Sequence, residues 1–221
     1  MTIDVLLVDD HAVVREGYRR LLDQTDDIRI LAEAGNGEDA YRLFCELRPQ
    51  VVVMDISLPR ISGIEITRRM VAREPAARVL VFSMHEDVVF ASRALAAGAR
   101  GYIAKSAAPE VLVEAIRRVA TGRSYVDHAM AERLALQRVG TDPDPVSVLT
   151  EREFEVFRLL AQGQAVSEIA RILNLTAKTV ANHQSALRQK LGVDNAAQLV
   201  RLAARHGIIQ DVSFRDSSPE P

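Results

Sequence analysis

Five side chains that could carry out phosphoryl chemistry stand at or just after the ends of short apolar runs in the first half of the chain. They are three carboxylates, one hydroxyl and one amine: Asp9, Asp10, Asp55, Ser83 and Lys105. Clustered carboxylates repel one another, and Mg²⁺ relieves that repulsion because it prefers oxygen ligands and bridges carboxylate to phosphoryl oxygen. A carboxylate beside Mg²⁺ can attack a phosphoryl group, while an amine and a hydroxyl hold its oxygens. Together these residue types predict an aspartate that accepts phosphate.

The elements that must bring these side chains together are strands alternating with helices over residues 1–120. The runs predicted to be strands are Val5–Val8, Ile28–Ala32, Val51–Met54, Val79–Phe82 and Gly101–Ile103. Helical patterns lie at 12–24, 37–47, 63–73, 87–97 and 109–120. This alternation predicts an α/β domain with a parallel sheet, as in a flavodoxin-like (βα)5 fold. Ligands of such sheets bind at the carboxyl ends of the strands, where the five side chains are expected.

Each of these residues also has an ordinary structural explanation. A single Asp after a strand is more often a helix cap or a solvated turn, Ser83 alone a turn hydroxyl, and Lys105 alone a surface lysine. Asp55 is a poor cap, because the capping-box pattern Ser62-Gly63-Ile64-Glu65 starts the next helix about seven residues later. The arrival of all five at the right strand ends favours a functional site.

The residues around these positions resemble the receiver domains of two-component response regulators. The resemblance spans residues 1–120 and rests on Asp9-Asp10, Met54–Pro59 with Gly63, Ser83 and Tyr102–Lys105. It implies that Asp55 is the phospho-acceptor. It also implies that Asp10, Asp55 and the backbone carbonyl of Ser57 bind Mg²⁺, with Asp9 assisting through water.

The same resemblance gives roles to three further residues. Ser83 and Lys105 would bind the phosphoryl oxygens, and Tyr102 would be an aromatic switch that turns inward as Ser83 moves to the phosphate. A half-buried strand tyrosine is the alternative for Tyr102. Two positions depart from the commonest receiver pattern: Ser106 stands where many receivers have proline, and Met84 where a small residue is frequent.

An aspartate nucleophile also occurs in haloacid-dehalogenase phosphatases, which need a second acid two residues further on. Ser57 occupies that position, and this argues against such an enzyme. The only chemistry we expect is self-phosphotransfer to Asp55 and its autodephosphorylation.

The pattern changes after Gly122, where the alternation of strands and helices ends. One short helix is predicted at 126–138, and the proline-rich segment Thr141–Pro145 disfavours its continuation. Beyond Leu149 four helices are predicted, the first starting at the capping box Thr150-Glu151-Arg152-Glu153. The expected order is a receiver-like domain, a linker with a short helix, a small all-α helix-turn-helix domain and a disordered tail, at 1–120, 121–148, 149–208 and 209–221.

The all-α segment contains the faces of a helix-turn-helix. One short helix has an apolar face made of Val166, Ile169, Ala170 and Leu173, and Thr176 is a good N-cap for the next helix. That next helix has an inward side with Val180, His183, Leu187 and Leu191. Its outward side is polar or small, with Lys178, Ala181, Asn182, Ser185 and Gln189. Residues 164–210 carry an excess of four positive charges, although on charge alone an ordinary solvated bundle is the better explanation.

Motifs of this segment resemble the LuxR-type DNA-binding domain over about residues 148–206. They are Leu149–Glu153, Gly163, Glu168–Ala170, Lys178–Val180, His183 and Lys190–Val193. Joined to a receiver, such a domain defines the NarL/FixJ family. The resemblance implies phosphate contacts from Thr176, Lys178, Thr179 and Lys190. It places Ala181, Asn182 and Ser185 at base edges in the major groove, where Asn182 could bond adenine bidentately.

Composition sets wider limits on the class of protein. With 48% hydrophobic and 26% charged residues the chain reads as globular, and its net charge of −2 neither suggests nor excludes a nucleic-acid partner. The single cysteine, Cys45, excludes an internal disulfide. No apolar run reaches the length of about 18 residues that suggests a membrane helix, and no secretory signal is evident at the N-terminus. We therefore expect a cytoplasmic protein with no membrane contact.

The two resemblances together imply a bacterial transcription factor that a sensor histidine kinase phosphorylates on Asp55 with Mg²⁺, switching its binding to promoter DNA. Homodimers would bind half-sites about one helical turn apart, and RNA polymerase could be a further partner. The last helix offers a pairing surface or simply core, with Leu199, Val200, Leu202 and Ala203. The alternative is a regulator that binds DNA without phosphorylation and uses its receiver as a protein-interaction module.

Overall fold

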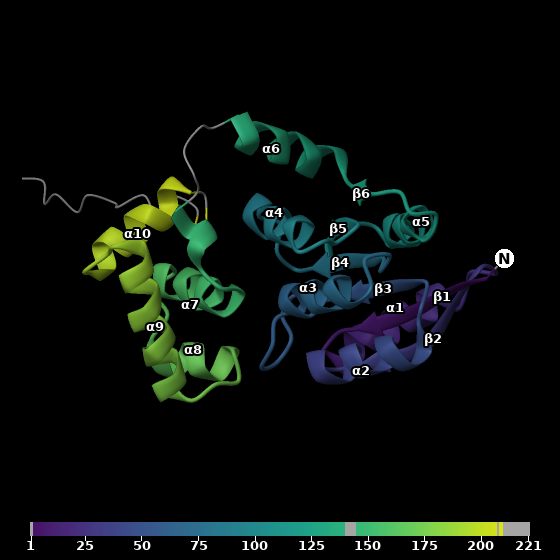
Figure 1. The fold of residues 1–221 in the computed structure, drawn as a ribbon, viewed down its shortest axis with the longest axis horizontal. Coiled ribbons are helices and arrows are strands. Elements are labelled where there is room, and N and C mark those ends of the chain that lie inside the picture. The colour runs from purple at the N-terminus through teal and green to yellow at the C-terminus, as the bar shows by residue number, and fades with distance from the viewer. Residues whose placement is uncertain (1, 140–144, 207, 210–221) are drawn as a thin grey trace, which may run out of the picture. The chain divides into compact units, whose positions relative to one another are not determined.

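A computed structural model describes residues 2–139, 145–206 and 208–209 of the chain. The chain forms two compact units, Met1–Asp142 and Pro143–Pro221. Figure 1 shows a layered α/β unit and a unit built of helices, which confirms the predicted fold class. Within the described ranges, no helix is both long and apolar enough to cross a membrane.

The first unit has one parallel sheet with the strand order β2-β1-β3-β4-β5-β6. Its strands are β1 (Ile3–Val8), β2 (Ile28–Ala34), β3 (Val51–Met54), β4 (Val79–Ser83), β5 (Gly101–Ala104) and β6 (Tyr125–Val126). Its helices are α1 (Ala12–Leu22), α2 (Gly37–Leu47), α3 (Gly63–Arg73), α4 (Val88–Ala96), α5 (Pro109–Ala120) and α6 (His128–Val139). All five predicted strands and all five predicted helices of residues 1–120 are therefore present.

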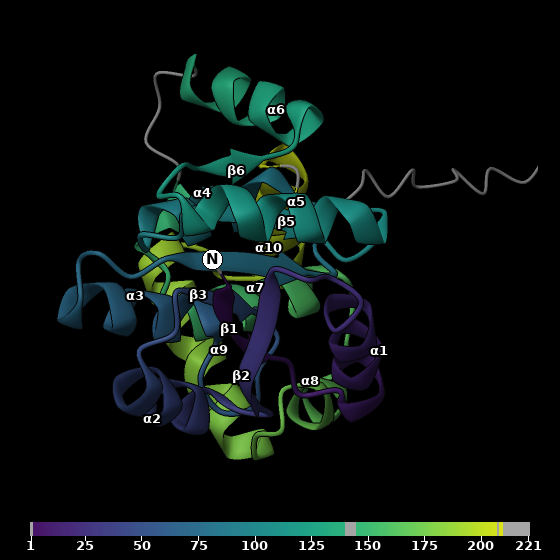
Figure 2. The same ribbon diagram turned by 90° about the vertical axis from the view of Figure 1, so that its right-hand side faces the viewer.

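Helices cover both faces of the sheet. Strands β3 and β4 are buried along their whole length, as the unbroken apolar run Val51–Met54 predicts. Helices α1 and α5 lie on one face and α2 and α3 on the other (Figure 2). Under α1 and α5 the core includes Leu22, Phe82 and Ile116, and Tyr18 meets Phe82 edge-on with ring centroids 4.7 Å apart.

The first unit continues past residue 120, where the sequence analysis ended the first domain. Strand β6 pairs with β5, α6 packs on α4, and Met130 of α6 is buried. The close approach of β6 depends on Gly101, because a Cβ there would lie 2.6 Å from the carbonyl oxygen of Tyr125. A strand of two residues is too short to show a periodic pattern, so the sequence did not reveal it.

The described part of the second unit contains the four α-helices that the sequence predicted, preceded by the 3₁₀-helix η1, which it did not predict. Their bounds are η1 (Pro145–Val148), α7 (Glu151–Ala161), α8 (Val166–Ile172), α9 (Ala177–Leu191) and α10 (Ala196–Arg205). The buried core includes Phe154, Phe157, Val180 and Leu187. Of the two interpretations of α10, a pairing surface or core, burial decides for two residues: Leu199 and Ala203 are buried within the unit and belong to its core.

Side-chain caps fix the starts of three of these helices, and that of α10 is Asn195, whose Oδ1 accepts the backbone N–H of Gln198 at 3.0 Å. Thr150 Oγ1 accepts a hydrogen bond from the backbone N–H of Glu153 at 3.3 Å, and Glu153 Oε2 accepts one from the N–H of Thr150 at 2.8 Å, completing the predicted capping box. Thr176 caps α9 by accepting from the N–H of Thr179 at 3.1 Å. At the other end of the unit Ile209 is buried, and the rest of the predicted tail, 210–221, lies outside the described residues.

Helix α3 starts where predicted and passes very close to the end of β3. Ser62 Oγ accepts the backbone N–H of Ile64 at 3.3 Å, whereas Glu65, the other half of the predicted capping box, forms ion pairs with two arginines of its own helix. Gly63 leaves no room for a side chain, because a Cβ there would lie 1.8 Å from the carbonyl oxygen of Asp55.

We therefore expect Gly63→Ala to destabilise the first unit by about 1–3 kcal/mol, as overpacking does. Gly17 is the control: it lies in α1 and only its own helix comes within 4 Å of its Cβ position, so Gly17→Ala should stabilise by up to about 1 kcal/mol through helix propensity. Urea unfolding followed by circular dichroism measures both. Equal stability changes for the two variants would contradict the close approach of α3 to Asp55.

Candidate functional site

The carboxyl ends of four adjacent strands bring the predicted pocket residues to one edge of the sheet. Asp9 directly follows β1, Asp55 follows β3, Ser83 ends β4 and Lys105 follows β5. Asp9, Asp55 and Ser83 have exposed fractions of 2%, 3% and 0%, whereas Asp10 is exposed beside them. Polar groups buried to this extent cost free energy unless they are paired.

Lys105 pairs with both buried carboxylates. Its Nζ donates to Asp9 Oδ2 at 2.6 Å and to Asp55 Oδ2 at 2.8 Å. Burial raises the pKa of Asp55, and the neighbouring Lys105 acts against that rise. Burial alone would lower the pKa of Lys105, but the two carboxylates outweigh it and raise that pKa. Lys105 is therefore charged, and it limits the cost of ionising Asp55 inside the protein.

The remaining negative charge makes the pocket suitable for a divalent cation. Ligand atoms of Asp9, Asp10, His11 and Asp55 all lie within 4.8 Å of one another. Three carboxylates and one lysine leave a formal charge of −2, which a divalent ion would neutralise. The donors are mainly carboxylate oxygens, the type that Mg²⁺ takes. This acidic cluster is compatible with Mg²⁺.

Ser57 lies beside this cluster. Its backbone N–H donates to Asp55 Oδ1 at 3.3 Å, so the Ser57 backbone folds back towards the carboxylate. Its Oγ lies 3.3 Å from His85 Nε2. His85 has no predicted role, and its ring stacks on Phe90 with centroids 4.0 Å apart.

A chain of hydrogen bonds joins Ser83 to Tyr102 through His85. Ser83 Oγ accepts the backbone N–H of His85 at 3.2 Å, and the carbonyl of His85 accepts the hydroxyl of Tyr102 at 2.7 Å. Tyr102 is completely buried, so it is not the half-buried strand tyrosine of the alternative interpretation. Burial raises the pKa of Tyr102, which keeps its hydroxyl protonated as a donor.

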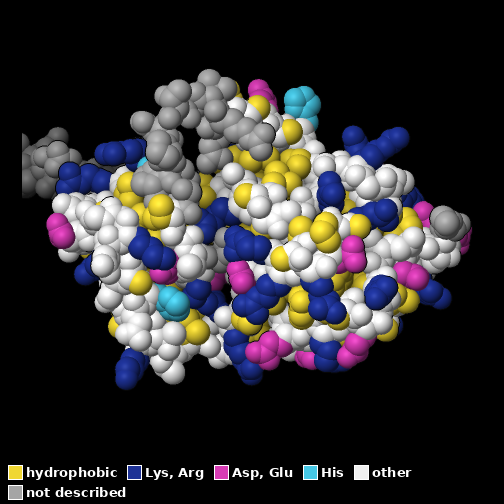
Figure 3. Space-filling view, in the orientation of Figure 1, with side chains coloured by type: hydrophobic (Ala, Val, Ile, Leu, Met, Phe, Trp, Pro, Cys, Tyr) yellow, Lys and Arg dark blue, Asp and Glu magenta, His cyan; other side chains and the backbone are white. Residues whose placement is uncertain are grey.

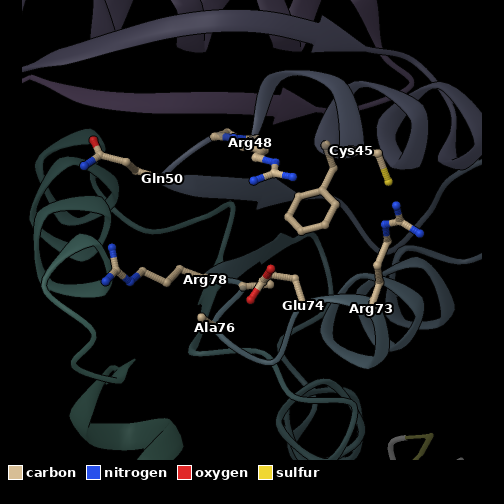
Figure 4. A pocket seen from close by; sticks show the side chains of 10 residues that line it. Cys45, Arg48, Gln50, Arg73, Glu74, Ala76 and Arg78 are labelled. Carbon is tan, nitrogen blue, oxygen red and sulfur yellow. The ribbon is translucent and has the colours of Figure 1, made fainter.

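A separate hollow of about 510 Å³ lies at the opposite end of the strands. It is lined by residues that precede β3 and β4, among them Arg48, Gln50, Glu74 and Arg78 (Figure 4). Because β3 and β4 are parallel, their amino ends lie away from the carboxyl ends that carry the acidic cluster. The single cysteine, Cys45, is partly buried at this hollow, which leaves it outside the phosphoryl chemistry.

In the second unit, α8, a tight turn and α9 have the predicted faces. Val180 and Leu187 of α9 are buried, and His183 and Leu191 are partly buried. The outward positions are all exposed: Lys178, Ala181, Asn182, Ser185 and Gln189. In Figure 3, Lys and Arg side chains on the visible face stand among Asp and Glu rather than in one continuous patch. The outward side of α9 is therefore exposed and polar or small, as predicted, without a continuous basic patch around it in this view.

Lys190, predicted to contact a DNA phosphate, has a partner inside its own unit. Its Nζ donates to Glu153 Oε2 at 2.7 Å, and Glu153 is a buried acid that also completes the capping box of α7. Burial tends to raise the pKa of Glu153, but Lys190 and Thr150 outweigh it and lower that pKa. Lys190 thus ties the end of α9 to the start of α7.

Comparison with known families agrees with both units. Residues 5–117 match the response regulator receiver domain, and residues 147–203 match the bacterial regulatory proteins of the luxR family. This chain belongs to the NarL/FixJ family of response regulators. As a response regulator it is a two-component signalling protein with a DNA-binding LuxR-type domain, not a catalytic enzyme.

Full-length relatives have the same arrangement. The response regulator is 42% identical over 209 residues to the transcriptional activator protein ExaE of Pseudomonas putida, covering 93% of this chain and 98% of the relative. It is 36% identical over 208 residues to the response regulator UvrY of Escherichia coli K12, covering 93% and 95%. The two alignments span nearly the whole of both chains, so the similarity includes both units.

Solved structures show similar folds. A LuxR-family response regulator from Aurantimonas is 44% identical with a TM-score of 0.61, covering 63% of this chain and all of the other. RcsB of Salmonella enterica, solved on promoter rprA with the phosphomimetic BeF3⁻, is 26% identical with a TM-score of 0.62, covering 92% and 99%. RcsB has also been solved as dimers bound to DNA.

Replacing Asp55 with asparagine should stabilise the metal-free response regulator at neutral pH, by about 1–3 kcal/mol. Burial raises the pKa of Asp55 above its ordinary value of 3.8, so the folded state binds this proton more tightly than the unfolded state. The ionised carboxylate therefore costs stability above its folded pKa, and the cost disappears as the pH falls below about 3.8. Thermal unfolding of wild type and Asp55→Asn between pH 4 and 8 should show a difference that shrinks towards acid.

Adding Mg²⁺ gives a second comparison of wild type with Asp55→Asn. The ion should raise the melting temperature of the wild type by binding the folded state, and raise that of Asp55→Asn much less. The exposed Asp26 serves as control, since Asp26→Asn should leave both responses unchanged. A lower melting temperature for Asp55→Asn than for wild type at pH 7 without Mg²⁺ would refute the cost of burying this carboxylate.

Proposed function

We propose that a sensor histidine kinase phosphorylates this response regulator on Asp55 in the presence of Mg²⁺, and that the phosphate switches its binding to promoter DNA. The observation that carries the proposal is the buried Asp55 held by Lys105 at 2.8 Å within a cluster of acids. A receiver used only as a protein-interaction module would have no need to bury two carboxylates around one lysine.

The chain's own residues supply most of the machinery for phosphoryl transfer. An Asp55 carboxylate oxygen attacks phosphorus, the bond from phosphorus to the donor breaks, and an acyl phosphate forms. Mg²⁺, held by Asp10, Asp55 and the carbonyl of Ser57 with Asp9 assisting through water, would neutralise phosphoryl charge. Lys105 would move one of its donors to a phosphoryl oxygen.

Ser83 and Tyr102 would carry the change away from the pocket. If Ser83 Oγ turns to the phosphate, it releases the N–H of His85 and so removes one of the hydrogen bonds that hold the loop before α4. That loop is tied to α6, because the carbonyl of Glu86 accepts a hydrogen bond from Arg133 Nη1 at 2.9 Å. Since α6 leads along the chain to the DNA-binding unit, a shift of the loop can bias that unit.

The second unit would read DNA with α9. Thr176, Lys178, Thr179 and Lys190 would contact phosphates and so set affinity, while Ala181, Asn182 and Ser185 would face base edges and set sequence preference. A homodimer would place two copies of α9 about one helical turn apart, in keeping with the RcsB dimers seen on DNA. RNA polymerase would be the next partner at the promoter.

Capture of genomic DNA fragments tests the switch. Wild type and Asp55→Ala are compared with and without acetyl phosphate and Mg²⁺, with Asp26→Ala as an exposed-acid control. We expect donor and Mg²⁺ to sharpen binding to specific fragments at least tenfold for wild type and Asp26→Ala only. Equal binding by all three proteins in every condition would leave the DNA-binding unit intact and favour the phosphorylation-independent regulator instead.

Two lysines of α9 separate DNA contact from structure. Removing one phosphate-binding side chain should reduce the slope of log K against log salt by about 1, so Lys178→Met and Lys190→Met should both flatten it. Only Lys190→Met should also lower the free energy of unfolding, by about 1 kcal/mol, because it leaves buried Glu153 without its cation. If Lys190→Met destabilises the unit but leaves the salt slope unchanged, Lys190 is purely structural.

A further inference from the structure

His11 places an imidazole against the acidic cluster. Its Nδ1 lies 2.7 Å from Asp10 Oδ1 and 3.5 Å from Asp9 Oδ1, and a ring nitrogen lies within 4.8 Å of a ligand atom on each of Asp9, Asp10 and Asp55. Two donors on opposite sides of a metal ion, each at about 2.1 Å, are about 4.2 Å apart. Small side-chain rotations would therefore let one ion bind the imidazole and the carboxylates together.

The backbone of His11 is fixed by hydrogen bonds that leave its ring facing the carboxylates of the cluster. Its N–H donates to Asp9 Oδ1 at 2.8 Å, and its carbonyl accepts the N–H of Arg15 at 3.0 Å in the first turn of α1. His11 is the N-cap residue of α1, yet its side chain makes no capping hydrogen bond. The side chain is 66% exposed, so it does not serve packing either. What the ring does contact is the acidic cluster.

The kind of donor, and not the charge, would decide which ion this pocket prefers. The formal charge of −2 attracts every divalent cation alike, whereas Mg²⁺ selects oxygen ligands and imidazole suits zinc, copper and nickel. Affinity for such mixed sites also rises along the first-row series towards copper. A neutral imidazole therefore adds to the binding of transition metals and adds little to that of Mg²⁺.

We propose that His11 is a ligand for transition metals in this pocket. Through His11 the pocket binds Zn²⁺, Ni²⁺ and Cu²⁺, in addition to the Mg²⁺ that its carboxylates bind without the imidazole. The inference rests on the proposed function, because it concerns the same acidic pocket. Nitrogen from His11 and oxygens from Asp10 and Asp55 form the ligand set. A transition-metal ion bound in this way occupies the place of Mg²⁺ and competes with it.

Untagged full-length protein is titrated with MgCl₂, NiCl₂ and ZnCl₂ by isothermal calorimetry, as wild type, His11→Ala and His11→Asn. Electron paramagnetic resonance with one equivalent of Cu²⁺ reports directly on nitrogen coordination. His128 lies outside the cluster on α6 and is exposed, so His128→Ala is the matched control. We expect both His11 variants to bind Ni²⁺ and Zn²⁺ at least tenfold more weakly and to lose the nitrogen coupling. Mg²⁺ affinity should change less than twofold, and His128→Ala should behave as wild type.

The outcomes separate this proposal from the one it rests on. Unchanged Ni²⁺ and Zn²⁺ affinities in His11→Ala, or nitrogen coupling that persists there, would overturn the role of His11 while leaving the Mg²⁺ pocket intact. Phosphorylation of Asp55 by acetyl phosphate and Mg²⁺, measured by mass spectrometry, should persist in the His11 variants. If wild type itself binds no Mg²⁺ and takes no phosphate on Asp55, the proposed function fails, whatever the Ni²⁺ titration shows.

Discussion

The structure of the first unit depends on burying two carboxylates at the ends of neighbouring strands and pairing both with one lysine. Asp9 and Asp55 cannot be moved into water without displacing β1 or β3, and neither can be buried cheaply without Lys105. Lys105 comes from the far side of β4 in the sheet order, so only a long, flexible side chain could reach both acids. The strand order of the parallel sheet and the pairing of these charges therefore depend on each other.

One cation for three acids leaves the pocket electrostatically incomplete. That deficit is useful, since a divalent ion can complete the pocket and a phosphoryl group can then be accommodated beside it. Because the pocket needs an added cation, its choice of ion depends on the donor atoms at its rim. An imidazole there favours transition metals over Mg²⁺. A group added at Asp55 also changes what Ser83 Oγ can accept or donate. The hydrogen bonds that run from Ser83 through His85 to Tyr102 would change with it.

The sequence predicted the parts that follow from local rules. Apolar runs located β1 to β5 because buried parallel strands need them along their length, and strand ends then located Asp9, Asp55, Ser83 and Lys105. The features it missed depend on tertiary contact. Strand β6 can pair with β5 because Gly101 lets Tyr125 approach. Glu65 does not complete the predicted capping box and instead forms ion pairs with two arginines one turn further along α3.

The ion pair of Lys190 with Glu153 joins residues 37 positions apart, and no periodicity records it. The sequence did not predict that His11 lies on the acidic cluster, since a histidine after two aspartates can equally cap the following helix. The predicted helix at 12–24 places His11 at a helix start, but only the structure shows that its ring lies against the carboxylates.

The α9 surface shows why a motif alone does not give each residue's role. Thr176 and Thr179 are occupied with each other, their hydroxyl oxygens 2.8 Å apart at the start of the helix, and Ser185 donates to the carbonyl of Ala181. Among the described residues, the side chains of Lys178 and Asn182 have no such partner. Thr176 and Thr179 build the start of α9, whose backbone N–H groups favour an anion, and Ser185 is bonded within the helix, whereas the side chains of Lys178 and Asn182 are free to move. In the proposed complex with DNA, Asn182 would therefore contribute most to discrimination between sequences, because a side chain already hydrogen-bonded within its own helix has less freedom to read a base.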